Sequence, residues 1–318
     1  MKKETKLIIL FGVLLICVVA YRLIVYINTN QEEVKKNALF DLDKDSITYL
    51  DWSYEGVNYA IEKNNGVWHW TNDDKFPVNQ DTAFDMADKF ATLSASNEIS
   101  AENIAEYGFN EAAQTICARD NDGKEYKVTV GGRIDLTGEN YITVDGMDSV
   151  YTVGADFAIA FDKAIDKLLK KESIDAIENY SKIRIVNDDV IVEIVKNDDD
   201  KWILGDTVLD ELKVSSLASS FFGLTWNACE DYNADAAKKA ECGFDKPSAV
   251  VSISSDADEL KILFGKEEND MLYAKLDGSN MIYTVSTEIK DKLNIGIDDL
   301  IPEAEQTEYT KNTEDTEE

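Results

Sequence analysis

The one histidine of the 318-residue chain, His69, is the side chain best suited to acid–base chemistry near neutral pH. It lies between Trp68 and Trp70, in a segment whose residue types are typical of a strand. A catalytic histidine needs a nucleophile or an orienting partner, and a metal site needs further ligands at defined spacing. The sequence contains neither a GxSxG nor an HExxH motif. We therefore predict a structural role for His69 and no metal site.

Two loops contain parts of known ligand-binding patterns, but neither pattern is complete. Gly131–Gly138 is rich in glycine, yet it fits neither GxxxxGK(S/T) nor GxGxxG, and we expect no helix after it to hold a phosphate. Asp41–Asp45 begins like a calcium loop. However, Ser46 stands where the turn glycine belongs, and Trp52 where the bidentate glutamate belongs. We predict no catalytic, cofactor-binding or metal-binding residue, and we expect that the protein is not an enzyme.

The four cysteines do not form a recognisable framework. Cys17 falls in an apolar N-terminal run, which leaves Cys117, Cys229 and Cys242 for the rest of the chain. A disulfide between Cys229 and Cys242 stays open, and it would leave Cys117 unpaired. Because no spacing is CxxC, the sequence indicates neither a disulfide scaffold nor a zinc site.

Five tryptophans raise the question of an aromatic binding surface. Trp68 and Trp202 occupy matching positions in the two halves of the chain, which favours a shared role in the core. Trp52, Trp70 and Trp226 are the candidates for a ligand or partner surface, because aromatic rings offer large amphipathic contact areas. Core packing is the competing interpretation of the set, and the sequence favours it.

The composition is strongly acidic, with 63 Asp and Glu against 32 Lys and Arg and a net charge of −31. Such a surface repels phosphate backbones, so we expect no nucleic-acid partner. With 44% hydrophobic residues the chain is not disordered as a whole, but residues 302–318 are predicted to form a disordered acidic tail. A carboxylate pair for glycoside hydrolysis stays open as a minor alternative, because acidic residues are everywhere and no pair stands out.

The N-terminus has the pattern of a single-pass membrane anchor. Residues 1–6 carry three lysines and are predicted to be cytoplasmic, whereas residues 7–27 are almost wholly apolar and match the length of a bilayer-spanning helix. Residues 28–37 are a polar linker. This pattern predicts an extracytoplasmic body at the cell membrane. A signal peptide cleaved after residues 18–20 is the alternative.

The remainder of the chain is an internal duplication. Four landmarks recur in the same order at offsets of 131 to 135 residues: Trp68 and Trp202, Phe90 with Leu93 and Phe221 with Leu224, Gly108-Phe109 and Gly243-Phe244, and Asp145-Gly146 and Asp277-Gly278. This period is too long for a solenoid unit and indicates tandem domains. We place the two repeats at residues 38–171 and 172–301.

Each repeat is predicted to be a mainly antiparallel, β-rich α+β domain with two or three helices. Alternating β-branched and aromatic segments joined by short glycine turns predict hairpins. The first repeat should contain three helices. One is capped near Asn79 or Asp81, a short one ends at Gly108, and the last spans residues 155–169. The second should contain helices at 210–224 and 288–293.

These features resemble an uncharacterised bacterial family, domain of unknown function 4340. The matching features are the lysine-led apolar N-terminus, Trp68, a helix ending near Leu93, and the phrases Tyr107-Gly108-Phe109, Gly243–Pro247, and Asp277-Gly278 with Ile282–Val285. The likeness runs from Lys2 to about Pro302. The first copy departs from it, because Asn110–Ala112 stands where the second has Asp245–Pro247. The resemblance implies a companion of ABC-type export systems, without established catalytic residues.

We therefore expect a non-catalytic, membrane-anchored extracytoplasmic protein that serves as an accessory or docking component of an ABC-type transport or envelope system. Its expected partners are the membrane and a transporter permease or another envelope protein. The alternative function is a glycan- or peptide-binding module that uses the tryptophans.

Overall fold

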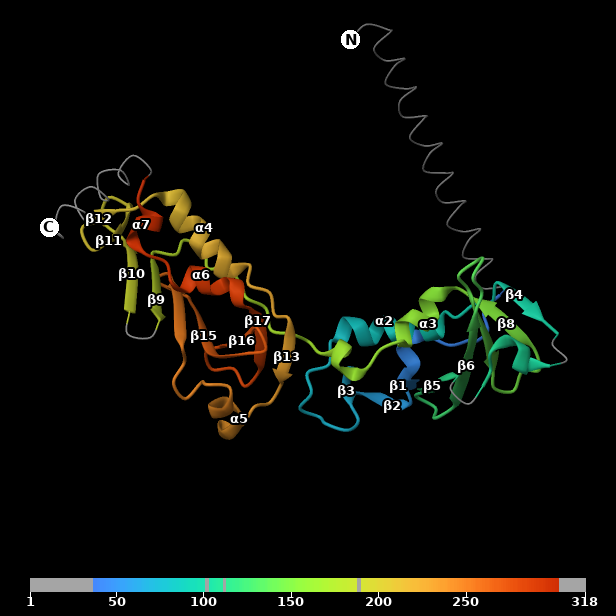
Figure 1. The fold of residues 1–318 in the computed structure, drawn as a ribbon. Helices are drawn as coiled ribbons and strands as arrows, with labels where there is room; N and C mark the ends of the chain where they lie inside the picture. The colour runs from blue at the N-terminus through green and yellow to red at the C-terminus, as the bar shows by residue number, and fades with distance from the viewer. Residues whose placement is uncertain (1–36, 101–102, 111–112, 188–189, 303–318) are drawn as a thin grey trace, which may run out of the picture. The chain divides into compact units, whose positions relative to one another are not determined.

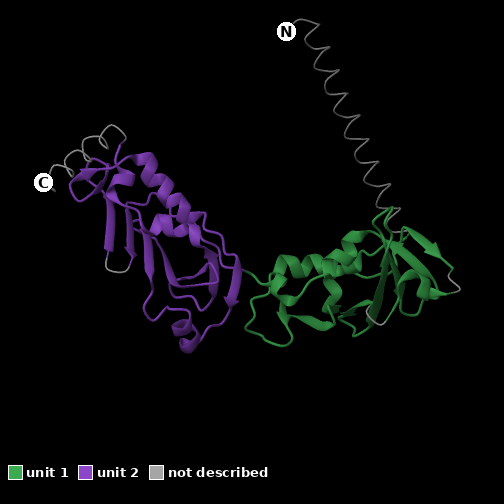
Figure 2. Cartoon of the chain, viewed as in Figure 1, with its two compact units in different colours: residues 1–170 green, residues 171–318 purple. Residues whose placement is uncertain are grey.

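The structure of the chain is a computed structural model that describes residues 37–100, 103–110, 113–187 and 190–302 (Figure 1). The chain forms two compact units, which divide between Lys170 and Lys171 (Figure 2). None of the helices in these described ranges is both long and apolar enough to cross a membrane. The predicted span at 7–27 and most of the predicted acidic tail lie outside the described residues.

The first unit is built on an eight-stranded sheet with the strand order β3-β2-β1-β5-β6-β7-β8-β4. Every neighbouring pair of strands is antiparallel. The strands are β1 (Ile47–Tyr54), β2 (Val57–Asn64), β3 (Val67–Trp70), β4 (Asn97–Ile99), β5 (Gln114–Asp120), β6 (Glu125–Arg133), β7 (Asn140–Val144) and β8 (Val150–Val153).

The second unit repeats this arrangement in a nine-stranded antiparallel sheet with the order β12-β11-β10-β9-β14-β15-β16-β17-β13. Its strands are β9 (Lys182–Asn187), β10 (Val190–Lys196), β11 (Trp202–Leu204), β12 (Thr207–Val208), β13 (Ala228–Asp231), β14 (Ala249–Ser254), β15 (Glu259–Glu268), β16 (Met271–Leu276) and β17 (Ile282–Ser286). Apart from the added edge strand β12, each strand has a counterpart in the first unit. The predicted tandem repeat and antiparallel α+β class are confirmed.

Helices cover one face of each sheet (Figure 1). The first unit contains η1 (Lys44–Ser46), α2 (Gln80–Ala91), η2 (Ile104–Tyr107), α3 (Ala155–Phe161) and η3 (Ile165–Leu168). The second contains α4 (Glu211–Phe222), α5 (Ala236–Glu241), η4 (Thr287–Ile289), α6 (Lys290–Leu293) and α7 (Ile297–Leu300). Figure 1 shows α2 and α3 along the first sheet, and α4, α6 and α7 along the second. Most buried strand residues face these helices. The opposite face of each sheet is covered near its β7–β8 or β16–β17 end, where Tyr107 packs on Tyr141 in the first unit and Phe244 and Tyr273 pack on a buried cluster with Cys242 and Ile282 in the second.

Helix α2 illustrates how local sequence sets an element. Asn79 is its N-cap, and the Asn79 side chain accepts a hydrogen bond from the Thr82 amide at 3.2 Å. The apolar residues of the helix recur at helical spacing and are buried. They are Ala83, Met86, Ala87, Phe90 and Ala91. The prediction of a helix that begins at Asn79 is therefore confirmed.

The predicted helix over 155–169 is wrong, because the structure has two shorter helices, α3 and η3, there. Between them Ala164 is extended, with φ −77° and ψ 167°. The Lys163 carbonyl accepts a hydrogen bond from the Trp52 indole at 2.7 Å. This backbone oxygen thus pairs with a buried side chain of β1 at the place where the helix breaks.

The repeated Gly-Phe phrase is a close backbone contact in both units. Gly108 and Gly243 have positive φ angles of 84° and 88°, a conformation that glycine adopts without the cost of a Cβ. Each packs on a strand that is irregular at that point, since β6 shifts register after Val130 and β15 after Phe264. In the second unit the Lys266 amide donates to the Cys242 carbonyl at 2.9 Å. The phrase therefore serves packing and not chemistry.

Candidate functional site

The helix-free face of the first sheet carries a row of side chains that we call the central row: Ala60, Asp51, Cys117 and Lys127, on β2, β1, β5 and β6. The strand register places Asp51 opposite both Ala60 and Cys117, and Cys117 opposite Lys127. Because successive side chains of a strand point to opposite faces, the buried neighbours Leu50 and Ile116 turn toward the helices. The central row thus brings a carboxyl, a thiol and an amine onto one open surface.

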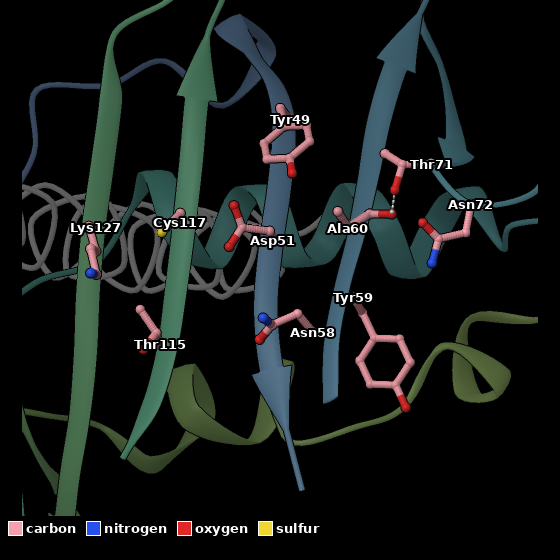
Figure 3. A pocket seen from close by; sticks show the side chains of 10 residues that line it. All are labelled: Tyr49, Asp51, Asn58, Tyr59, Ala60, Thr71, Asn72, Thr115, Cys117 and Lys127. Carbon is pink, nitrogen blue, oxygen red and sulfur yellow. Dashed lines mark hydrogen bonds between the residues drawn. The ribbon is translucent and has the colours of Figure 1, made fainter. Parts of the chain in front are cut away.

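A shallow depression of about 470 Å³ lies over the central row (Figure 3). It is lined by Tyr49, Asp51, Asn58, Tyr59, Ala60, Thr71, Asn72, Thr115, Cys117 and Lys127. Figure 3 shows Cys117 between Asp51 and Lys127, each on its own strand. Because the side chains of Ala60 and Cys117 are short, they form the floor of the depression, and the longer polar side chains form its walls. This arrangement can hold a small polar molecule.

The thiol and the carboxyl in this depression influence each other. Burial raises the pKa of Asp51, and a hydrogen bond from the Cys117 thiol partly offsets this shift. Burial is also the largest cause that raises the pKa of Cys117 to about 11, followed by the negative charge of Asp51. A thiol with this pKa is protonated at neutral pH, and the thiolate is the reactive form. Cys117 in this setting is a hydrogen-bond donor to Asp51 and not an activated nucleophile.

This pKa predicts slow alkylation of Cys117. The ordinary thiol pKa of 9.0 and the raised value of about 11 imply about 100-fold less thiolate at neutral pH. Because the folded-state pKa is raised, the rate should climb until the pH approaches 11. The measurement is the pH dependence of iodoacetamide labelling of the Cys117 peptide, read by mass spectrometry. Asp51→Asn is the matched variant, and removing its charge should lower the midpoint. A midpoint near 9 in the unsubstituted protein would contradict the prediction.

The second unit has different chemistry at the same positions. Lys127 and Lys261 are equivalent positions, because each lies three residues before the register shift of its strand. With these two lysines aligned, the residues of the second unit that correspond to the central row are Glu193, Arg184, Ser252 and Lys261. There the charges neutralise one another. Glu193 lies 3.1 Å from Lys182 and 3.4 Å from Arg184, and Lys261 lies 3.1 Å from Asp277. The first unit has the short Ala60 where the second has the long, ion-paired Glu193, and this difference helps to open the depression in the first unit.

The neighbouring row of the same face also differs between the repeats. In the first unit its members are polar and mostly carry hydroxyls: Asn58, Ser53, Thr115, Thr129 and Thr143. In the second unit four of the five counterparts form what we call the apolar row: Ile191, Val186, Val250 and Leu263, which the register aligns across β10, β9, β14 and β15. The fifth counterpart is Lys275 of β16, which lies opposite Leu263. Ile191 is 56% exposed. The duplicated sheet therefore presents a polar face in one copy and a partly apolar face in the other.

Two of the three tryptophans predicted as a ligand or partner surface are buried in their own units. Trp52 is fully buried, and Trp226 is buried in the other unit, where it stacks on Tyr283 at a ring-centroid distance of 4.5 Å. Trp70 is half-buried on β3 and packs against Phe76 at 5.2 Å. Because neither Trp52 nor Trp226 presents a ring to solvent, they do not form the predicted platform.

Trp68 and Trp202 have the same environment in the two units. Both are buried, and a lysine of the neighbouring strand lies over each ring, Lys63 at 5.4 Å and Lys196 at 5.3 Å. Each tryptophan pairs with that lysine in the strand register. This repeated cation–π contact agrees with the shared core role expected from their recurrence.

The remaining candidates of the sequence are dispersed. His69 is half-buried on the edge strand β3, opposite Glu62. Cys117, Cys229 and Cys242 are free thiols, so the disulfide left open by the sequence is not formed. Among the described residues, no three His, Cys, Asp or Glu side chains are grouped as a metal site would require. The central row was not foreseen, because no motif marks it and only the register of four strands assembles it.

Comparison with known proteins identifies the repeated unit. A family model described as a domain of unknown function, DUF4340, matches residues 68–206 and again residues 203–305. Neither the curated proteins nor the solved structures include a match to this chain. Each match begins at or just after the landmark tryptophan of its repeat, Trp68 or Trp202. The two matches together cover well over half of the sequence, and the chain therefore belongs to the DUF4340 family and contains two tandem copies of its domain.

Proposed function

We propose that this protein is a non-catalytic, membrane-anchored extracytoplasmic component that docks on an integral membrane partner, most simply the permease of an ABC-type transport system. The N-terminal sequence supports the anchor, since residues 1–6 carry three lysines and residues 7–27 are almost wholly apolar. The resemblance noted from the sequence supports the class of partner. The structural feature that best supports docking is the apolar row on the second sheet.

The apolar row has the composition of an interface centre. Val186 and Val250 face each other across β9 and β14, and Ile191 and Leu263 extend the row on either side. The adjacent row carries the ion-paired side chains Arg184, Glu193 and Lys261, which would form a polar rim. An apolar centre with a charged rim is the usual anatomy of a protein–protein contact. The matching surface of the first unit lacks this apolar centre, and this difference supports docking through the second unit.

Site-specific photo-crosslinking tests this role. A benzoylphenylalanine is placed at Val250 in the full chain, in its native membranes, and the same residue at Thr115 is the matched control because the two positions correspond. We expect adducts with a transmembrane permease from Val250 and none from Thr115. Val250→Glu should abolish co-purification of that permease, because a charge would enter the centre of the contact. Equal adducts from both positions, or none from Val250, would refute the docking role.

A further inference from the structure

We propose that the depression over the central row binds a small hydroxylated carboxylate of the sugar-acid class. In this arrangement the ligand carboxylate pairs with Lys127, and its hydroxyl groups donate to Asp51. This binding site is a different surface from the docking row of the second unit, and neither proposal depends on the other.

The Lys127 amine acts on Asp51 only through its charge, which opposes the rise that burial causes in the pKa of that carboxyl, without an ion-pair contact. Within the described residues no carboxylate lies within ion-pair distance of the Lys127 amine, whereas the corresponding Lys261 pairs with Asp277 at 3.1 Å. Asp145 holds the place of Asp277 in the first unit, but it contacts Lys127 through the backbone, where its amide donates to the Lys127 carbonyl at 3.0 Å. The net charge of −31 repels anions from most of the surface. A lysine without an ion pair is therefore a local exception at which an anion can bind.

The depression also offers space between its two charged groups. Asp51 and Lys127 are separated by one strand, so their backbones lie roughly 10 Å apart, twice the usual strand spacing. Between them stands Cys117, whose side chain is short, and beside Asp51 stands Ala60. The volume of about 470 Å³ falls in the range of small-molecule sites. The short side chains of Cys117 and Ala60 therefore leave room for a ring-sized ligand between the two charged groups.

The polar groups that line the depression match such a ligand. A carboxylate has about four acceptor positions, and the Cys117 thiol uses one of those of Asp51. The others can accept ligand hydroxyls. Asn58 and Asn72 add amide donors and acceptors at the rim. A simple anion would use Lys127 but be repelled by Asp51, and a neutral sugar would leave Lys127 without a partner. A ligand with a carboxylate at one end and hydroxyls at the other satisfies both.

The test is binding of D-glucuronate to the full chain, measured by ligand-observed NMR, with D-glucose and acetate as comparison ligands. For a ligand of this size on an open site we expect a dissociation constant on the order of 1 mM. Glucose lacks the carboxylate and acetate lacks the hydroxyls, so each should bind at least about tenfold more weakly. Absence of glucuronate binding, or equal binding of either comparison ligand, would overturn the proposal.

Three variants locate the site. Lys127→Met keeps the aliphatic stem and should weaken glucuronate binding about tenfold or more. Ala60→Glu introduces the side chain of the second unit into the depression and should abolish binding. Lys261→Met is the matched control and should leave binding unchanged. Each variant is first checked for an unchanged thermal melt, which is expected because the changes lie on the open face. Binding that survives both Lys127→Met and Ala60→Glu would place the ligand elsewhere and refute the site.

Discussion

Replacing Gly265 by alanine should lower the free energy of unfolding of the second unit by about 3 kcal/mol, the upper range for forcing atoms into a packed site. The new Cβ would overlap the Cys242 carbonyl oxygen, and the Phe244 ring lies 3.3 Å from the same position. The overlapping atom is backbone, and it already accepts a hydrogen bond from the Lys266 amide. It therefore cannot move aside cheaply. The measurement is urea unfolding followed by circular dichroism, with the two units fitted as separate transitions.

Gly278→Ala is the control for this prediction. Unlike Gly265, Gly278 has a positive φ, 77°, but a Cβ there would meet no atom within 4 Å. It should cost only the backbone strain, about 1 kcal/mol. The corresponding change in the first unit, Gly131→Ala, would place a Cβ 2.5 Å from the Tyr107 carbonyl oxygen and should affect the first transition instead. Equal effects of Gly265→Ala and Gly278→Ala would show that the Gly-Phe contact is not a packing constraint.

The parts of the fold that follow from the sequence are those encoded locally. The turn at Glu55-Gly56 and the cap at Asn79 are set by a few adjacent residues, and the structure has both. The repeat was recognisable because its landmarks are packing constraints. Gly108 and Gly243 both lie against the backbone of a neighbouring strand, and neither position has room for a Cβ atom. Such positions tolerate few alternatives, so two copies retain the same residue.

The parts that were missed depend on distant partners. Strand β4 consists of Asn97, Glu98 and Ile99, and it exists because it pairs with β8 at the edge of the sheet. Strand β13 is its counterpart in the second unit and pairs with β17. Neither shows the alternation of polar and apolar residues by which a strand is recognised, since an edge strand of three or four residues buries few side chains. The break after α3 likewise depends on Trp52, more than 100 positions away in the sequence.

The central row could not be predicted for the same reason. Asp51, Cys117 and Lys127 lie on three strands that are adjacent only in the folded sheet. A shift of one residue in any strand would turn its member toward the core. The family match does not mark the site either. It begins at Trp68, so it omits β1 and β2 from the first copy, and these strands carry Asp51 and Ala60.

Trp226→Ala should also have a large effect, a loss of about 3–5 kcal/mol from the stability of the second unit, as for other large-to-small changes in a core. Trp226 is 6% exposed and stacks on Tyr283. Its indole nitrogen donates to the Glu172 carbonyl at 2.8 Å, while the Glu172 amide donates to the Tyr283 hydroxyl at 2.8 Å. The two rings thus fix the start of the second unit. Urea unfolding of the full chain measures the loss.

Two further variants separate packing from recognition at Trp226. Leu212→Ala removes a side chain that is 80% exposed, and its effect should stay within about 0.5 kcal/mol. Trp226→Phe keeps an aromatic ring on Tyr283 but leaves the Glu172 carbonyl without the indole donor, so it should cost about 1–3 kcal/mol. If Trp226→Ala left stability unchanged while weakening the binding of a glycan or a peptide, the ring would act at a surface after all. The graded loss from Phe to Ala is expected instead, because the tryptophan closes a core and the open faces of the two sheets remain for binding.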